Sequence, residues 1–190
     1  MALTQLEFQP PTSGMPPSVK DFLEQTAPLV EQHRTKIPGG FRGFVPSDYQ
    51  AFYYAISHLF EQRLAFGLTF CEWGSGLGIS TCLASMVGYE AFGIEIDEKL
   101  VEAAEAIAED FELPVAYAAG SLLPDGADDL IDEAFGENDG EISMVIQPDN
   151  AYEQIGFELD EFDVVFSFPW PTDEELTAKI FDRFANVGSI

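Results

Sequence analysis

The sequence predicts a doubly wound α/β fold with a mostly parallel sheet. One observation behind this is a strand–turn–helix unit, in which the largely apolar run 68–73 leads into glycines at alternate positions and then into a helix of small residues. Another is a second apolar run at 91–96, about twenty residues further along the chain, which an acidic residue follows. Strand-like and helix-like segments also alternate through the rest of the chain, which is typical of a parallel sheet with helices on both faces.

The N-terminal part predicts an arm and then a helix. Residues 1–17 contain four prolines and show no periodicity, so we expect an extended arm. Ser18 is the expected N-cap of a helix over 19–36. This helix should bend or break near Pro28, because proline cannot donate a backbone hydrogen bond.

A loop and a second helix come next. The Gly- and Pro-rich stretch 37–46 predicts a loop, and its phenylalanines either fill the core or belong to a flap over a ligand. Ser47 is the expected cap of a helix over 48–64, whose apolar residues recur at steps of three and four. The glycine unit follows, and Gly88 stands where its helix should end.

The middle of the chain continues the alternation. The strand over 91–96 leads into a helix over 99–111, which has one apolar side. Residues 113–120 predict a third strand, and a short helix is expected around 129–135 in an acidic, glycine-containing stretch.

The last part of the chain predicts a buried strand and a final helix. Residues 141–146 suggest a short strand or hairpin arm, with 152–159 as its partner. The apolar run 162–168 predicts a fully buried strand. Thr172 begins a capping box for a helix over 173–185.

Length and charge limit the possible functions. A chain of 190 residues predicts one domain, in which a helical segment, 18–65, joins a core over 66–190. The sequence has 34 acidic and 8 basic residues, a net charge of −26. Free DNA or RNA would be repelled, and no basic stripe offsets this, so direct nucleic-acid binding is not expected. Solubility or adaptation to high salt would each explain the acidic surface.

The cysteines and histidines show no metal-ligand spacing, so no metal site is expected. Cys71 and Cys82 fall in a predicted strand and the helix after it, which indicates small buried thiols in a reducing compartment. The start has no basic leader with an apolar core, and no apolar run approaches the ~20 residues of a membrane helix. We therefore expect a cytoplasmic protein.

The glycine unit resembles a known family. Glu72-Trp73-Gly74-Ser75-Gly76-Leu77-Gly78 is similar to the first motif of the class I, Rossmann-like S-adenosylmethionine-dependent methyltransferases, and Gly93-Ile94-Glu95-Ile96-Asp97 is similar to their second motif. The likeness spans about 66–185 and implies S-adenosyl-L-methionine as the cofactor. Its implied binding residues are Glu72 at the amino-acid end, Gly74, Ser75, Gly76 and Gly78 beneath the methionine and ribose, Glu95 on the ribose hydroxyls, Ile96 against the adenine, and Gly120 and Ser121 near the adenine amino group.

The choice of cofactor depends on a few positions. Where the family usually has an acid after its third strand, Gly120 is followed by Ser121, whose hydroxyl is a weaker acceptor. An NAD-dependent oxidoreductase is the competing interpretation, because its second strand also ends in an acid. Its glycine turn, however, needs Gly or Ala where this sequence has Ile79. Glu72 would also repel a pyrophosphate, whereas it suits a cationic ligand.

A second motif concerns the methyl acceptor. Ser167-Phe168-Pro169-Trp170 resembles the (Asn/Asp/Ser)-x-Pro-(aromatic) motif of methyltransferases that act on nitrogen. The resemblance implies that Ser167, Pro169 and Trp170 position an amine, with the aromatic face stacking on a flat substrate. The alternative is a proline turn that closes the strand, with Trp170 packed in the core. Given the acidic charge, a small molecule or a protein with a basic segment is the expected acceptor.

The end of the chain raises a further alternative. The family normally continues with a fifth strand where this sequence ends at Ile190, so we expect the C-terminal strands to be lacking. The N-terminal arm or a second copy of the chain would then cover the edge of the fourth strand. A non-catalytic Rossmann-like module that works by protein contact is the alternative to a methyltransferase.

Overall fold

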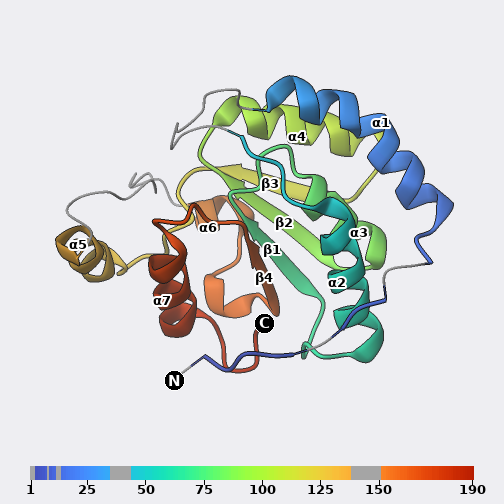
Figure 1. The fold of residues 1–190 in the computed structure, drawn as a ribbon. Coiled ribbons are helices and arrows are strands. Elements are labelled where there is room, and N and C mark those ends of the chain that lie inside the picture. Colours follow the sequence, from blue (N-terminus) through green and yellow to red (C-terminus); the bar gives the residue numbers. More distant parts are fainter. Residues whose placement is uncertain (1–2, 8, 12–13, 35–43, 138–150) are drawn as a thin grey trace.

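The computed structural model describes residues 3–7, 9–11, 14–34, 44–137 and 151–190, and it shows an α/β fold (Figure 1). Its strands form one parallel sheet in the order β3-β2-β1-β4. The strands are β1 Thr69–Trp73, β2 Glu90–Glu95, β3 Val115–Ala119 and β4 Val164–Ser167. The predicted fold class and the four strands of the predicted core are thus confirmed.

Helices cover both faces of the sheet (Figure 1). The α-helices are α1 Pro17–His33, α2 Tyr49–Gln62, α3 Ile79–Val87, α4 Glu98–Asp110, α5 Asp128–Glu137, α6 Ala151–Ile155 and α7 Glu174–Phe184, and a 3-10 turn, η1, spans Leu159–Glu161. One core lies between the sheet and helices α1 to α4, and the other lies between the sheet and helices α5 to α7. No helix within these ranges is long and apolar enough to cross a membrane.

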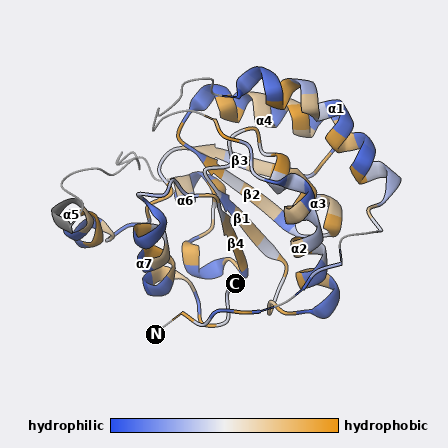
Figure 2. Cartoon of the chain, in the orientation of Figure 1, coloured by the Kyte–Doolittle hydropathy of each residue, from blue (hydrophilic) through white to orange (hydrophobic). Residues whose placement is uncertain are grey.

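The strands alternate between the two cores because successive side chains of a strand point to opposite faces. Phe70 of β1 packs in the core under α2 and α3, while Cys71 and Trp73 pack in the core under α6 and α7. Hydrophobic residues accordingly gather in the central strands, and hydrophilic residues gather on the surrounding helices (Figure 2). Glu72 shares the face of Phe70, so the fold directs this acid toward α3.

Two predicted helix caps near the N-terminus are wrong. Ser18 lies inside α1, whose N-cap is Pro16, because Pro17 fits the first helical position, where no backbone donor is needed. The helix also continues through Pro28. Asp48, and not Ser47, caps α2, with its carboxylate accepting the Ala51 N–H at 3.0 Å.

Two predictions in the C-terminal half are also wrong. Residues 152–159 form α6 and η1 and not a hairpin strand, because a helical turn lets Tyr152 bury its ring and donate its hydroxyl hydrogen to Leu122 O at 2.8 Å. The proposed partner strand, 141–146, lies outside the described residues. Thr172 does not cap α7, which begins at Glu174 with Asp173 as its N-cap residue.

The outer edge of β4 is partly covered by the end of the chain. The N–H of Ile190 donates to Asp163 O at 2.9 Å, and the N–H of Val165 donates to Ile190 O at 2.8 Å. These two bonds are the pattern of a parallel pairing between Ile190 and Val164. At these residues the chain's own end therefore covers the edge, where we had expected the N-terminal arm or a second copy.

Asp163 joins β4 to the beginning of β1. Its Oδ2 accepts the Thr69 N–H at 2.9 Å and the Thr69 hydroxyl at 2.7 Å. Asp163→Ala should lower the free energy of unfolding by about 1–3 kcal/mol, because two part-buried donors lose a charged acceptor. Urea denaturation followed by circular dichroism measures this. The control is Asp160→Ala, at an exposed position of η1, and equal losses in the two variants would contradict the role of Asp163.

Candidate functional site

The glycine turn lies at the carboxyl ends of the strands, between β1 and α3. The N–H groups of Gly74 and Ser75 both donate to Ile94 O, at 2.9 and 3.0 Å, and thereby tie the turn to the end of β2. The φ angles of Gly74, Gly76 and Gly78 are 71°, 54° and 66°. Residues other than glycine are strained in this left-handed region of backbone conformation, so the path of the turn itself requires glycines.

The space beside the three glycines differs. A Cβ on Gly74 would meet no atom within 4 Å, so this position faces open space. A Cβ on Gly76 would lie 2.6 Å from ring carbons of Phe44, and one on Gly78 would clash with Tyr117. The Tyr117 hydroxyl donates to Gly78 O at 3.1 Å. A ligand therefore has free approach to the backbone at Gly74, while the other two glycines accommodate the protein's own rings.

Glu95 lies beside the turn, at the end of β2. Its Oε2 accepts the Gly76 N–H at 2.9 Å, and its Oε1 accepts the Asp97 N–H at 3.0 Å. The residue is 9% exposed, so the carboxylate faces the turn and not bulk solvent. Each oxygen of a carboxylate can accept a second hydrogen bond, which leaves capacity for a ligand's hydroxyl groups. Ile96, which follows, is half-buried.

Glu72 is buried beneath α3. Its Oε2 accepts both the N–H of Thr81, at 2.9 Å, and the Thr81 hydroxyl, at 2.6 Å. Burial raises the pKa of Glu72 to about 7, although the hydrogen bonds from Thr81 act in the opposite direction. The carboxylate is thus used within the protein. Thr81 was not among the predicted site residues, and its only sequence signal is a hydroxyl in the first turn of the helix after the glycines.

The third strand brings Gly120 and Ser121 to the same edge. The N–H of Gly120 donates to Glu95 O at 2.9 Å, which links the ends of β2 and β3. Ser121 is buried, and its Oγ accepts the Leu123 N–H at 3.2 Å. Its hydroxyl oxygen therefore already holds the chain after β3. Ser75 is also buried, and its Oγ has no hydrogen-bond partner among the described residues.

The predicted acceptor segment follows β4. Ser167 is paired in register with Trp73, the residue before Gly74, so β4 ends beside the glycine turn. Phe168 is 59% exposed, and Trp170 is half-buried and not enclosed as a core side chain would be. The carbonyl of Trp170 accepts the Asp173 N–H at 2.8 Å, which closes a turn around Pro171 that leads into α7.

The segment before α2 lies over the glycine turn, which sequence reasoning left open. Phe44 is buried in the core and its ring contacts Gly76, so this phenylalanine both fills the core and covers the turn. Burial raises the pKa of Tyr49, and the charge of Glu72 raises it further, so the start of α2 is also close to this site. The rest of the predicted flap, up to residue 43, lies outside the described residues. Within the described ranges, no group of three or more His, Cys, Asp or Glu could hold a metal ion.

No protein-family model matches the sequence, and no curated protein matches it. Solved structures are similar. The O-methyltransferase from Bacillus cereus in complex with SAH is 16% identical, with a TM-score of 0.50, and the match covers 91% of this chain and 63% of that one. Cofactor-bound Rv0187 from MTB is 15% identical, with a TM-score of 0.50, covering 87% of this chain and 61% of that one.

The chain therefore spans less than two thirds of the length of these two proteins. The similarity establishes the fold, and the Rossmann-like methyltransferase fold predicted from the two motifs is confirmed.

The buried carboxyl of Glu72 should make stability depend on pH. Its pKa of about 7 in the folded protein exceeds the ordinary value of 4.5, so folding favours the protonated form. The stability that the folded protein gains from this preference for protonated Glu72 is fully present below pH 4.5 and is lost as the pH rises through 7. Glu72→Gln lacks the titration, so between about pH 4 and about pH 8 the variant should gain on the order of 3 kcal/mol relative to the wild type.

Urea denaturation at a series of pH values measures this difference. The matched control is Glu90→Gln, which changes an exposed carboxyl at the other end of the sheet, in β2, and its difference from the wild type should stay flat with pH. If the difference in unfolding free energy between Glu72→Gln and the wild type also does not change with pH, then ionisation of Glu72 does not destabilise the folded protein, and the prediction is wrong.

Proposed function

We propose that the chain is an S-adenosylmethionine-dependent methyltransferase of the class I superfamily, which acts on nitrogen in a small molecule or a protein. One observation carries the proposal. At the carboxyl edge of the sheet, the glycine turn has an open backbone at Gly74, and the carboxylate of Glu95 at the end of β2 is hydrogen-bonded to the same turn through the Gly76 N–H. A ligand that lies flat on a backbone and offers neighbouring hydroxyl groups suits this pair.

The residues at the edge fit the cofactor in part. Glu95 retains capacity for the ribose hydroxyls, and Gly74 leaves room for the chain of atoms that joins the ribose to the amino acid. The unpartnered hydroxyl of Ser75 is a further polar group in the turn. Glu72 and Ser121, in contrast, already accept backbone hydrogen bonds, so we assign them a supporting role. When bound, the cofactor supplies a methyl group already activated by a sulfonium.

An activated methyl group leaves the protein mainly the task of positioning the acceptor. Ser167 ends β4 in register with Trp73, so the acceptor segment begins near the turn, and we assign to the Ser167 hydroxyl a hydrogen bond from the amine. Pro169 fixes its own φ and restricts the backbone of Phe168 before it, and the half-buried Trp170 retains exposed ring surface for stacking. The net charge of −26 favours a neutral or cationic acceptor over a nucleic acid.

A non-catalytic module is the second candidate, and one contact favours it. The Phe44 ring lies against Gly76, in the middle of the turn, and it narrows the approach to the backbone there. A domain that no longer bound a cofactor would gain stability by such a contact. The two candidates make opposite predictions for cofactor binding.

Calorimetry with S-adenosylhomocysteine tests the cofactor. The wild type should bind in the micromolar range, and Glu95→Ala should weaken binding at least about tenfold, or about 1.4 kcal/mol, because the ribose hydroxyls lose their acceptor. Glu90→Ala is the control, since it removes an exposed carboxyl from the far end of the same strand and should leave the affinity unchanged. If the intact protein shows no heat of binding at millimolar ligand, the module is the correct description.

Methyl transfer tests the acceptor segment. With cofactor labelled in its methyl group and cell extract as the source of acceptors, the wild type should label a product. Trp170→Ala should reduce this labelling at least about tenfold while leaving cofactor affinity unchanged, because only the stacking surface is lost. Phe66→Ala removes an 88% exposed ring near the opposite end of β1 and serves as the control. Equal labelling by the two variants would remove Trp170 from the site.

A further inference from the structure

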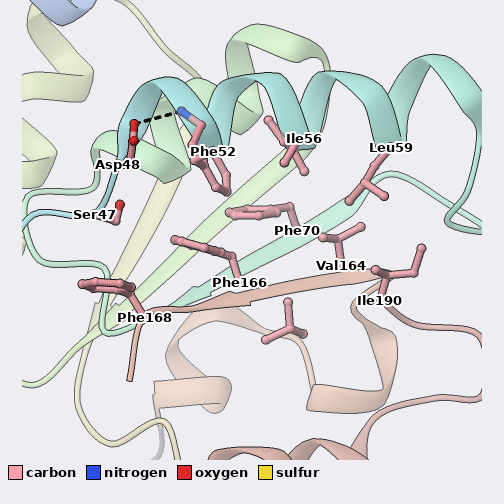
Figure 3. Close-up of a pocket in the computed structure, with 13 residues that line it drawn as sticks. Ser47, Asp48, Phe52, Ile56, Leu59, Phe70, Val164, Phe166, Phe168 and Ile190 are labelled. Carbon is pink, nitrogen blue, oxygen red and sulfur yellow. Dashed lines mark hydrogen bonds between the residues drawn. The ribbon is translucent and has the colours of Figure 1, made fainter. Parts of the chain in front are cut away.

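An apolar groove lies between α2 and β4 (Figure 3). Its volume is about 380 Å³, within the range of small-molecule sites. Apolar side chains from α2, β1 and β4 line most of it, among them those of Phe52, Phe70 and Phe166. The polar lining residues, Ser47 and Asp48, lie together at the end that also holds Phe168 (Figure 3). The groove thus has one polar end and one apolar end.

The polar end is next to the glycine turn. Phe168 follows Ser167, which is the register partner of Trp73, the residue before Gly74. On the other side, Ser47 comes three residues after Phe44, whose ring contacts the turn at Gly76. Two independent parts of the chain therefore place the polar end of the groove near the glycine turn, where we propose that the cofactor binds.

The charge at this end selects the kind of ligand. Asp48 is exposed, and its Oδ1 caps α2 by accepting the Ala51 N–H at 3.0 Å, which leaves its other oxygen for a ligand. Among the described residues, no lysine or arginine lines the groove. With a net charge of −26 on the chain, an anion is disfavoured there and a cation is attracted.

We propose that the groove binds the apolar body of the methyl acceptor, and that this acceptor is a small aromatic or aliphatic amine whose nitrogen lies near Asp48, at the end of the groove that holds Phe168. The inference rests on the proposed methyl transfer and specifies its substrate class. A ligand of this kind buries its hydrocarbon part against the phenylalanines and keeps its polar atom at the edge where the chemistry is proposed.

Two other occupants of the groove are less favoured. A partner's strand could add to the edge of β4, but Ile190 already occupies the edge between Asp163 and Val165. A second copy of the chain would bring another net charge of −26 against the first. A small cationic ligand meets neither obstacle.

Binding of 2-phenylethylamine to the full chain, measured by NMR titration without cofactor, tests the inference. The amine should bind, and Ala55→Leu should weaken it at least about tenfold, because Ala55 lines the groove and a larger side chain fills it. The matched control is Gln50→Leu, which adds the same side chain at an exposed position of α2 outside the groove and should have no effect.

Asp48→Asn tests the charge separately. Asparagine caps helices about as well as aspartate, so the fold should be kept. The variant should bind 2-phenylethylamine at least about tenfold more weakly, while its affinity for neutral 2-phenylethanol stays that of the wild type. In the wild type, the anion 3-phenylpropionate should bind more weakly than 2-phenylethylamine or 2-phenylethanol, because Asp48 would repel its carboxylate.

Several results would overturn the inference. Binding of the amine that Ala55→Leu does not change would place the ligand elsewhere, and equal binding of amine and carboxylate would remove the role of Asp48. A dimer in analytical ultracentrifugation that Ala55→Leu dissociates would make the groove a subunit contact. Calorimetry with S-adenosylhomocysteine distinguishes failure of this inference from failure of the proposed methyl transfer. Cofactor binding without amine binding overturns this inference alone, and failure to bind the cofactor overturns the methyl transfer on which it rests.

Discussion

The left-handed glycine turn and its attachment to β2 are the constraint on which the site depends. Ile94 O accepts two N–H groups of the turn, and the Glu95 carboxylate accepts a third, from Gly76. These bonds hold the turn against the neighbouring strand, so its open backbone and the carboxylate face the same space. Any side chain at Gly74, Gly76 or Gly78 would strain this path, because each has a positive φ. The same few residues therefore determine both the local fold and the proposed ligand surface.

The parallel sheet determines what surrounds this turn. Because alternate residues of β1 face opposite cores, Glu72 is directed under α3, where Thr81 binds it, while Trp73 enters the other core. Glu72 thus supports the turn from below, and Glu95 is the carboxylate at the edge. The two acids differ in what they bind: Glu72 accepts hydrogen bonds from Thr81 of α3, and its pKa rises to about 7 because its carboxyl is removed from water, whereas Glu95 accepts the N–H of Gly76 in the turn.

The groove beside β4 extends this arrangement from cofactor to acceptor. It begins where β4 ends, next to the turn, and it continues along α2 as an almost wholly apolar surface (Figure 3). In the part of the chain that the structure describes, Asp48 is the one charged residue that lines it, and Asp48 also caps α2. A residue needed for the fold thus lies where an amine would be recognised. The aromatic side chains of α2 and β4 that shape the groove also hold these two elements together, with the Phe52 and Phe166 rings 4.6 Å apart.

The sequence by itself determined the parallel α/β fold, the four strands of the sheet, the glycine turn and the acid at the end of β2, because each of these follows from local periodicity and turn chemistry. Only the tertiary structure decided that Phe44 covers Gly76, that Thr81 binds Glu72, that residues 151–155 form a helix and that Ile190 pairs with β4. It also decided where the groove lies. These features depend on contacts between segments far apart in the chain, and burial and packing there override the local preferences that a sequence pattern reports.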